Sequence, residues 1–355
     1  MIRKPLPNIW GSYGCQDNIL DFLPALEVLR LQSINRASYG GTIARCQSKF
    51  RLQKMIVFTC HYDDEFINRI YLFDEKVGAR KLTNKKIFNF EKTVTVVVNK
   101  DLYAFKWGKK SVQVYKITNC TSKDQRVKTS LPILKGKNYL EAFAVTYWSA
   151  GGSIVLTGGS TTDSDRNSHD SAQTFQMDVQ TDSWRKDISP ALNVARRYLT
   201  SCAMGQQVYV ACGLADEALS SVEILRQGAV AWELIEIPDF LPRWDALFCQ
   251  IDESNLVILG GIYGCEGRSR SSGVVLNAQS CALVKHIDPA SDCEFYCKGQ
   301  TAQRTAGQVV ALVNASVSPF VRGCRSLRMI SYNQATDTVT TVLNYGGDTV
   351  YYDDG

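Results

Sequence analysis

A short β-strand that ends in a diglycine recurs along this chain and limits the folds open to it more than any other feature. The clearest copy, residues 153–159, is rich in β-branched side chains and ends at Gly158 and Gly159. A polar loop and an alternating strand at residues 174–178 follow it. This succession is typical of an antiparallel hairpin. Because one hairpin cannot bury its own face, the pattern predicts further copies of the unit.

Related segments stand on both sides of this copy. Residues 256–261 read LVILGG, and residues 208–213 read VYVACG, with Cys212 in place of the first glycine. Weaker copies lie at residues 55–60, 94–105 and 308–315. The position of the first glycine is occupied by Thr59, Ala104, Gly158, Cys212, Gly260 and Asn314, at intervals of 45, 54, 54, 48 and 54 residues. A period near 50 residues is typical of the four-stranded blades of a β-propeller.

A second spacing supports the repetition, because pairs of large apolar residues stand seven positions apart. The pairs are Met177 and Trp184, Leu225 and Trp232, Leu276 and Leu283, and Tyr332 and Val339. Together with the diglycine, this pattern resembles the kelch-repeat family, whose unit contains a diglycine, then a Tyr, then a Trp. The resemblance covers roughly residues 50–345 and is best in the two units that contain Gly158 and Gly213. It implies an all-β fold, a six-bladed kelch-type β-propeller over residues 46–355; another repetitive all-β arrangement is the alternative.

The size and composition of the chain fit one large β body. The chain has 355 residues, of which 45% are hydrophobic, and a net charge of +5. A body of this size buries enough apolar surface to need no disulfide or metal. The 12 cysteines are scattered singly, so we expect buried thiols in a reducing compartment. The closest pair, Cys293 and Cys297, lacks the spacing of a zinc site, and no metal or other cofactor is predicted.

The charge and hydropathy patterns exclude two classes of partner. Lys and Arg are nowhere dense enough for a nucleic-acid groove. The first 18 residues contain no apolar run of signal-peptide length, and no stretch of 18 apolar residues occurs that could span a membrane. We therefore expect a cytoplasmic protein, with the nucleus as the alternative, that binds neither nucleic acid nor a membrane.

The first 45 residues form a separate N-terminal segment, in which helical periodicity begins at Asp17. Residues 19–39 read ILDFLPALEVLRLQSINRASY, with Asp17 as a predicted N-cap and Pro24 able to open a helix. This string resembles the central part of an F-box, although the upstream helix of a full F-box is missing or reduced. The resemblance implies that the segment binds a Skp-type adaptor, and through it a cullin, with the apolar residues Leu23, Pro24, Leu26, Leu29 and Leu31. The alternative is a helical cap that packs this face against the propeller.

Residues with catalytic chemistry are sparse, so the sequence does not predict an enzyme. The three histidines, His61, His169 and His286, lie far from one another. A glycine-rich phosphate loop and a nucleophile elbow are absent from the sequence. Asp163, Asp165 and Asn167 imitate the start of a calcium loop, but Ser168 replaces its glycine, which favours a plain strand connection.

Arginines recur where one unit passes to the next and in the hairpin loops. Because Arg forms bidentate pairs with carboxylates and phosphates, they predict a face that docks an acidic or phosphorylated protein client. The predicted residues of this face are Arg196, Arg197, Arg243, Arg268, Arg270 and Arg322. Alternatively, Arg197 and Arg243, which precede first strands, serve the fold by bonding turn carbonyls.

Three hypotheses for the function follow. In the first, the propeller holds a protein client and the N-terminal segment joins it to an F-box-type ubiquitin ligase. In the second, the propeller is a structural or cytoskeletal kelch scaffold with no link to a ligase. The third, an enzyme built on a propeller, is the weakest, because nothing in the sequence supplies its catalytic groups.

Overall fold

A computed structural model describes residues 55–62, 65–74, 78–81, 93–98, 101–107, 111–117, 125–132, 137–163, 167–185, 189–263, 268–269, 272–287, 302–305, 308–315 and 326–345. These residues form strands and connecting turns, with no helix among them. The chain divides into two compact units, Met1–Met55 and Ile56–Gly355. The predicted N-terminal helix, with Leu23, Pro24, Leu26, Leu29 and Leu31, lies outside the described residues.

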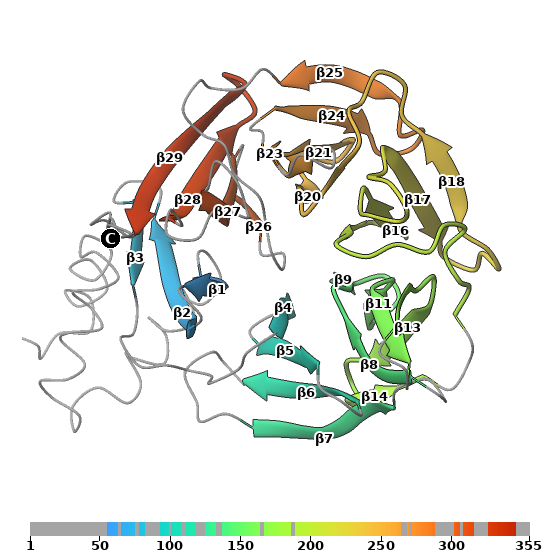
Figure 1. The fold of residues 1–355 in the computed structure, drawn as a ribbon. Helices are drawn as coiled ribbons and strands as arrows, with labels where there is room; N and C mark the ends of the chain where they lie inside the picture. Colours follow the sequence, from blue (N-terminus) through green and yellow to red (C-terminus); the bar gives the residue numbers. More distant parts are fainter. Residues whose placement is uncertain are drawn as a thin grey trace, which may run out of the picture. The chain divides into compact units, whose positions relative to one another are not determined.

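Five antiparallel sheets have four strands each, and they follow one another along the chain (Figure 1). The first contains β4 (Thr93–Val98), β5 (Asp101–Trp107), β6 (Ser111–Ile117) and β7 (Gln125–Pro132). The second contains β9 (Ala144–Trp148), β10 (Ser153–Thr157), β13 (Thr174–Asp178) and β14 (Ser183–Trp184). The third contains β15 (Thr200–Met204), β16 (Gln207–Ala211), β17 (Ser221–Arg226) and β18 (Glu233–Glu236).

The remaining two four-stranded sheets complete this series. One contains β20 (Leu247–Gln250), β21 (Asn255–Leu259), β24 (Gly273–Asn277) and β25 (Leu283–Ile287). The other contains β26 (Ala302–Thr305), β27 (Gln308–Ala315), β28 (Ser326–Asn333) and β29 (Thr338–Tyr345). In each of the five sheets the strands pair in chain order, so each is an antiparallel meander.

Three smaller sheets have three strands each. The first, β1 (Met55–Tyr62), β2 (Glu65–Asp74) and β3 (Gly78–Lys81), precedes the series. The other two join a strand that precedes a four-stranded sheet to a hairpin inserted after its second strand. They are β8 (Lys137–Glu141) with β11 (Ser160–Asp163) and β12 (Ser168–Asp170), and β19 (Arg243–Trp244) with β22 (Ile262–Tyr263) and β23 (Arg268–Ser269).

Successive sheets contact one another through their first strands. β4 contacts β9, β9 contacts β15, β15 contacts β20, and β20 contacts β26. The last strand, β29, contacts β3. An all-β succession of four-stranded meanders that touch through their first strands is compatible with a β-propeller.

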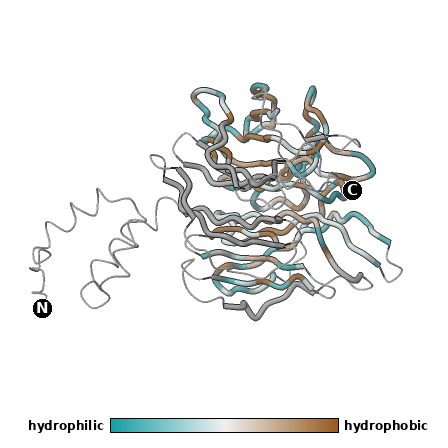
Figure 2. Tube along the Cα trace, turned by 60° about the vertical axis from the view of Figure 1, so that its left-hand side comes forward, coloured by the Kyte–Doolittle hydropathy of each residue, from teal (hydrophilic) through white to brown (hydrophobic). Residues whose placement is uncertain are grey.

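The core lies between neighbouring sheets, because the second strands are buried on both faces. In β16, Val208 and Val210 pack in the same cluster as Val155 of β10. The alternate residues Tyr209 and Ala211 face the other way and pack in a cluster with Ile258 of β21 and its neighbours. In Figure 2 brown, apolar stretches alternate with teal, hydrophilic ones along the coloured part of the tube.

The seven-residue spacing in the sequence is the register of the hairpin between third and fourth strands. Met177 faces Trp184, Leu276 faces Leu283, and Tyr332 faces Val339 across their hairpins. The first residue of each of these turns accepts hydrogen bonds from the backbone two and three positions later; these capping residues are Asp178, Asn277 and Asn333. The fifth residue has a positive φ, at Asp182, Cys281 and Asp337. The turn therefore explains why the spacing repeats.

Some of the other strand predictions are confirmed by the structure, and others are wrong. The strand predicted at residues 174–178 is confirmed as β13. The polar loop expected after Gly159 contains the hairpin β11–β12. The weak markers Thr59, Ala104 and Asn314 lie inside strands rather than after them, because without a diglycine nothing ends the strand there.

Candidate functional site

Tight turns that contain glycine hold the ends of three second strands against neighbouring backbone. They follow β10, β16 and β21 at residues 158–159, 212–213 and 260–261, and all six residues have positive φ. A Cβ at the second position would approach a carbonyl oxygen closely, at 2.6 Å for Gly159, 3.0 Å for Gly213 and 2.9 Å for Gly261. Glycine is required there both for its φ and for this close approach.

The same turns hold the segment that enters the next sheet. The backbone N–H of Gly159 donates to the carbonyl of Arg196, which leads into β15, at 2.8 Å. The N–H of Gly213 donates to the carbonyl of Arg243, which leads toward β20, at 3.0 Å. The backbone of each of these two arginines is thus held in place independently of its side chain.

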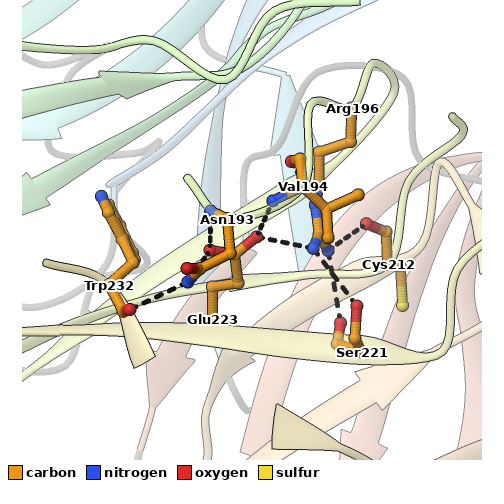
Figure 3. A network of polar contacts seen from close by, with 7 residues as sticks. All are labelled: Asn193, Val194, Arg196, Cys212, Ser221, Glu223 and Trp232. Carbon is orange, nitrogen blue, oxygen red and sulfur yellow. Dashed lines mark hydrogen bonds and ion pairs between the residues drawn. The ribbon is translucent and has the colours of Figure 1, made fainter. Parts of the chain in front are cut away.

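The Arg196 side chain is fully buried and bonds to the turn it adjoins (Figure 3). Its Nη1 donates to the carbonyl of Cys212 at 3.0 Å, and its Nη2 donates to Ser221 Oγ at 3.2 Å. Its Nη2 also lies 2.7 Å from Glu223 Oε1. Burial lowers the pKa of the Arg196 guanidinium, and the charge of Glu223 acts in the opposite direction. The ion pair is therefore what permits a charged arginine at this depth.

Glu223 is the hub of this network, and the sequence analysis did not single it out. Its Oε2 accepts hydrogen bonds from the backbone and the side-chain amide of Asn193, at 2.6 and 3.0 Å. Its Oε1 accepts the backbone N–H of Val194 at 3.1 Å. Asn193 Nδ2 also donates to the carbonyl of Trp232 at 2.8 Å (Figure 3). A glutamate inside the apolar strand sequence SVEILR was the available signal, because a buried carboxylate needs partners.

Arg243 repeats the Arg196 arrangement one sheet later. Its Nη1 donates to the carbonyls of Gly260 and Ser272, at 2.9 and 2.7 Å, and its Nε donates to that of Leu241 at 3.1 Å. Its guanidinium lies 4.4 Å from the ring centroid of Phe240. Arg196 and Arg243 are buried, so their guanidinium groups are not offered to an external partner. For Arg243 this matches the alternative in which the arginine serves the fold.

The other predicted arginines differ in position. Arg197 is partly exposed, and its Nη1 lies 2.5 Å from Asp170 Oδ1. Its backbone pairs with that of Leu214. Arg268 lies in β23, opposite Tyr263 in the register of that ribbon. Arg270 and Arg322 lie outside the described residues. Among the predicted arginines whose side chains the structure describes, Arg197 is therefore the one that remains partly exposed.

The segments that precede β9, β15 and β20 share one backbone conformation but carry different side chains. Ala142, Tyr198 and Asp245 have φ of 54°, 53° and 51°. The N–H of Tyr198 donates to the carbonyl of Ala142, and the N–H of Asp245 donates to that of Tyr198, both at 2.9 Å. One position earlier, the chain carries Glu141, Arg197 and Trp244, all partly exposed. These segments therefore run side by side and present a mixed set of side chains.

An aromatic pair joins two of these segments. The rings of Tyr198 and Trp244 have centroids 5.2 Å apart. Burial raises the pKa of the Tyr198 phenol, and the charges of Asp245 and Glu141 raise it further. We define the Tyr198–Trp244 surface as the partly exposed residues Glu141, Asp170, Arg197, Tyr198 and Trp244.

Groups with catalytic chemistry are scarce in the part of the chain that the structure describes. No group of three His, Cys, Asp or Glu side chains able to hold a metal ion occurs among its residues. Within the same described ranges, no helix is long and apolar enough to cross a membrane. The thiols of Cys202, Cys212, Cys249 and Cys281 are buried and free of disulfides.

A scan against models of protein families finds no match to the chain, and a search of curated proteins finds none either.

Proposed function

We propose that the chain is a non-enzymatic protein-binding module, a six-bladed kelch-type β-propeller whose sheet ends bind a protein client. The observation that carries this proposal is the difference between two adjacent sets of positions. Arg196 and Arg243 make the same backbone contacts in successive sheets. The next position, by contrast, carries Glu141, Arg197 or Trp244 in equivalent backbone settings.

A repeated frame with variable side chains is the usual construction of a binding surface. The frame fixes the backbone through the diglycine turns, and the side chains beside it are not needed for the turns themselves. Binding residues lie disproportionately on loops that a rigid scaffold positions. Tyr, Trp and Arg, three types that dominate interface energetics, stand together on the Tyr198–Trp244 surface.

We further propose that the client is presented to a ubiquitin ligase. The support is the resemblance of residues 19–39 to an F-box, in which Leu23, Pro24, Leu26, Leu29 and Leu31 would bind a Skp-type adaptor and, through it, a cullin. The second candidate is a structural or cytoskeletal scaffold, in which the same apolar residues only cap the propeller. The cytoplasm or the nucleus, where thiols stay reduced, is the setting that suits the buried free cysteines.

Affinity purification of the full chain with mass spectrometry tests both parts. Leu29→Asp with Leu31→Asp places carboxylates on the predicted adaptor face, and Gln32→Asp, off that face, is the matched control. If the client-binding part is right, the same client proteins co-purify with wild type and with Gln32→Asp. They also co-purify with the double variant unless its leucines pack as a cap, in which case that variant is destabilised. If the ligase part is right, an adaptor and a cullin co-purify with wild type and Gln32→Asp and are lost from the double variant. Recovery of no specific protein by the wild-type chain contradicts the module itself.

A further inference from the structure

The Tyr198–Trp244 surface combines exposed aromatic area with negative charge. Tyr198 and Trp244 are partly exposed, and their rings meet at a tilt of 44°. The faces of such rings carry negative electrostatic potential and attract cations, Trp most strongly. An aromatic pair of this kind therefore favours a positively charged partner, in addition to offering apolar contact area.

Carboxylates surround this pair. Glu141 and Asp245 lie close enough to Tyr198 to raise the pKa of its phenol, whereas Arg197 lowers it and its ion-pair partner Asp170 raises it. Two further carboxylates, Asp216 and Glu217, are exposed in the turn that begins beside Arg197 at Leu214. The whole chain carries a net charge of +5, so this acidic neighbourhood is opposite in sign to the protein as a whole.

The three described arginines nearest this surface already have partners. Arg196 is buried against Glu223, and Arg243 is buried against the carbonyls of Gly260 and Ser272. Arg197 is partly exposed but already paired with Asp170. An acidic or phosphorylated segment docking here would have to displace Asp170 and approach the remaining carboxylates, which opposes binding.

We propose that the Tyr198–Trp244 surface binds a basic segment of the protein client, with an arginine or lysine side chain lying over the aromatic rings and pairing with the carboxylates around them. The inference rests on the proposed protein-binding function and specifies the chemistry of its partner. It reverses the charge expected from the arginines in the sequence. Electrostatic complementarity of this kind governs the choice of partner and the association rate, and salt screens it.

One substitution separates binding from folding. Tyr198 has a φ of 53°, a conformation that asparagine adopts more readily than a bulky residue does. Tyr198→Asn therefore removes the ring while favouring the local backbone. Val230→Ser is the surface control, because Val230 is 94% exposed and lies in the turn between β17 and β18.

The experiment is selection of random peptides displayed on phage against the immobilised full chain, followed by fluorescence anisotropy of the recovered peptides. We expect peptides enriched in arginine and lysine. Their affinity should fall at least about tenfold for Tyr198→Asn and for Trp244→Leu, and stay unchanged for Val230→Ser. It should also weaken between about 50 and about 500 mM NaCl. Glu217→Gln should weaken binding less than either aromatic change.

Each other outcome overturns the inference. Acidic peptides, or basic peptides that bind Tyr198→Asn as well as wild type, would place recognition elsewhere and leave the protein-binding function standing. Recovery of no peptide while client proteins still co-purify would also contradict this inference alone. Failure of both experiments would remove the proposed function together with it.

Discussion

Arg196 and Glu223 form a fully buried ion pair, with Nη2 2.7 Å from Oε1 and both side chains 0% exposed. The pair joins the segment that enters β15 to the third strand of the same sheet, β17. It also satisfies the backbone of Asn193 and Val194 through Glu223. A contact of this kind fixes the path of the segment that carries Arg197 and Tyr198.

Removal of Glu223 should destabilise the protein strongly. Glu223→Ala leaves the Arg196 charge buried and uncompensated, which costs about 3–5 kcal/mol in buried pairs. The measurement is the free energy of unfolding in urea. Glu233→Gln is the control, because its pair with Arg226 is exposed and should contribute less than about 1 kcal/mol. Equal effects of the two substitutions would show that the Arg196 pair is not buried as described.

Cys212 takes the place of the first glycine of the diglycine in the third four-stranded sheet, and its side chain fits there because the residue beside it is small. At Gly158, a Cβ would lie 2.7 Å from Leu199 Cδ1. At the equivalent Cys212, the residue corresponding to Leu199 is Ala246, and the two pack in one buried cluster. Ala246→Leu should therefore cost about 1–3 kcal/mol by overpacking.

A double-mutant cycle checks this dependence. Cys212→Gly with Ala246→Leu recreates the combination found at Gly158 and Leu199, and should recover at least about 0.5 kcal/mol relative to the sum of the single changes. Additive effects within error would mean that the two side chains do not share the space.

Asp337 should contribute to stability only while it is ionised. Lys285 and Tyr332 donate hydrogen bonds to its carboxylate and lower its pKa below the ordinary value of 3.8. A lowered folded-state pKa gives a stabilisation that is present above the unfolded-state pKa and lost as the pH falls through the folded-state value. The thermal midpoint of wild type should exceed that of Asp337→Asn at neutral pH, and the gap should close below about pH 4. Asparagine tolerates the φ of 54° at this position. A gap that is constant with pH would contradict the account.

The buried thiols should resist alkylation in the folded protein. Burial raises the pKa of Cys202, Cys212 and Cys281 to about 12, so their thiolate fraction at about pH 8 is negligible. Treatment of the native chain with iodoacetamide, followed by peptide mapping, should leave these three unmodified. Addition of urea to the unfolded baseline should expose all three, and rapid labelling without urea would show that the sheets open locally.

The parts of the fold that depend on turns were predictable from the sequence, because turns constrain residue type. The spacing from Met177 to Trp184 is the length of a hairpin turn, and the diglycine at residues 158–159 marks the end of a strand. Where these signals are missing, as around Thr59 and Ala104, the ends of the strands could not be predicted, since apolar runs alone do not fix where a strand ends.

The direction of a side chain was the part that sequence reasoning could not supply. Arg196 and Arg197 are neighbours, yet the first is buried and the second partly exposed. Burial of Arg196 depends on Glu223, which is 27 residues away in the sequence. A distant partner of this kind leaves only an indirect signal, a lone glutamate in an apolar strand.

Site-specific photo-cross-linking in cells tests the central claim most directly, namely that the client binds at the sheet ends beside Tyr198 and Trp244. A benzophenone amino acid at position 217 replaces the exposed Glu217, and the same group at position 230 replaces Val230, which is also exposed. The account predicts a cross-linked client from position 217 and none from position 230. A client captured from position 230 but not from position 217 would contradict it.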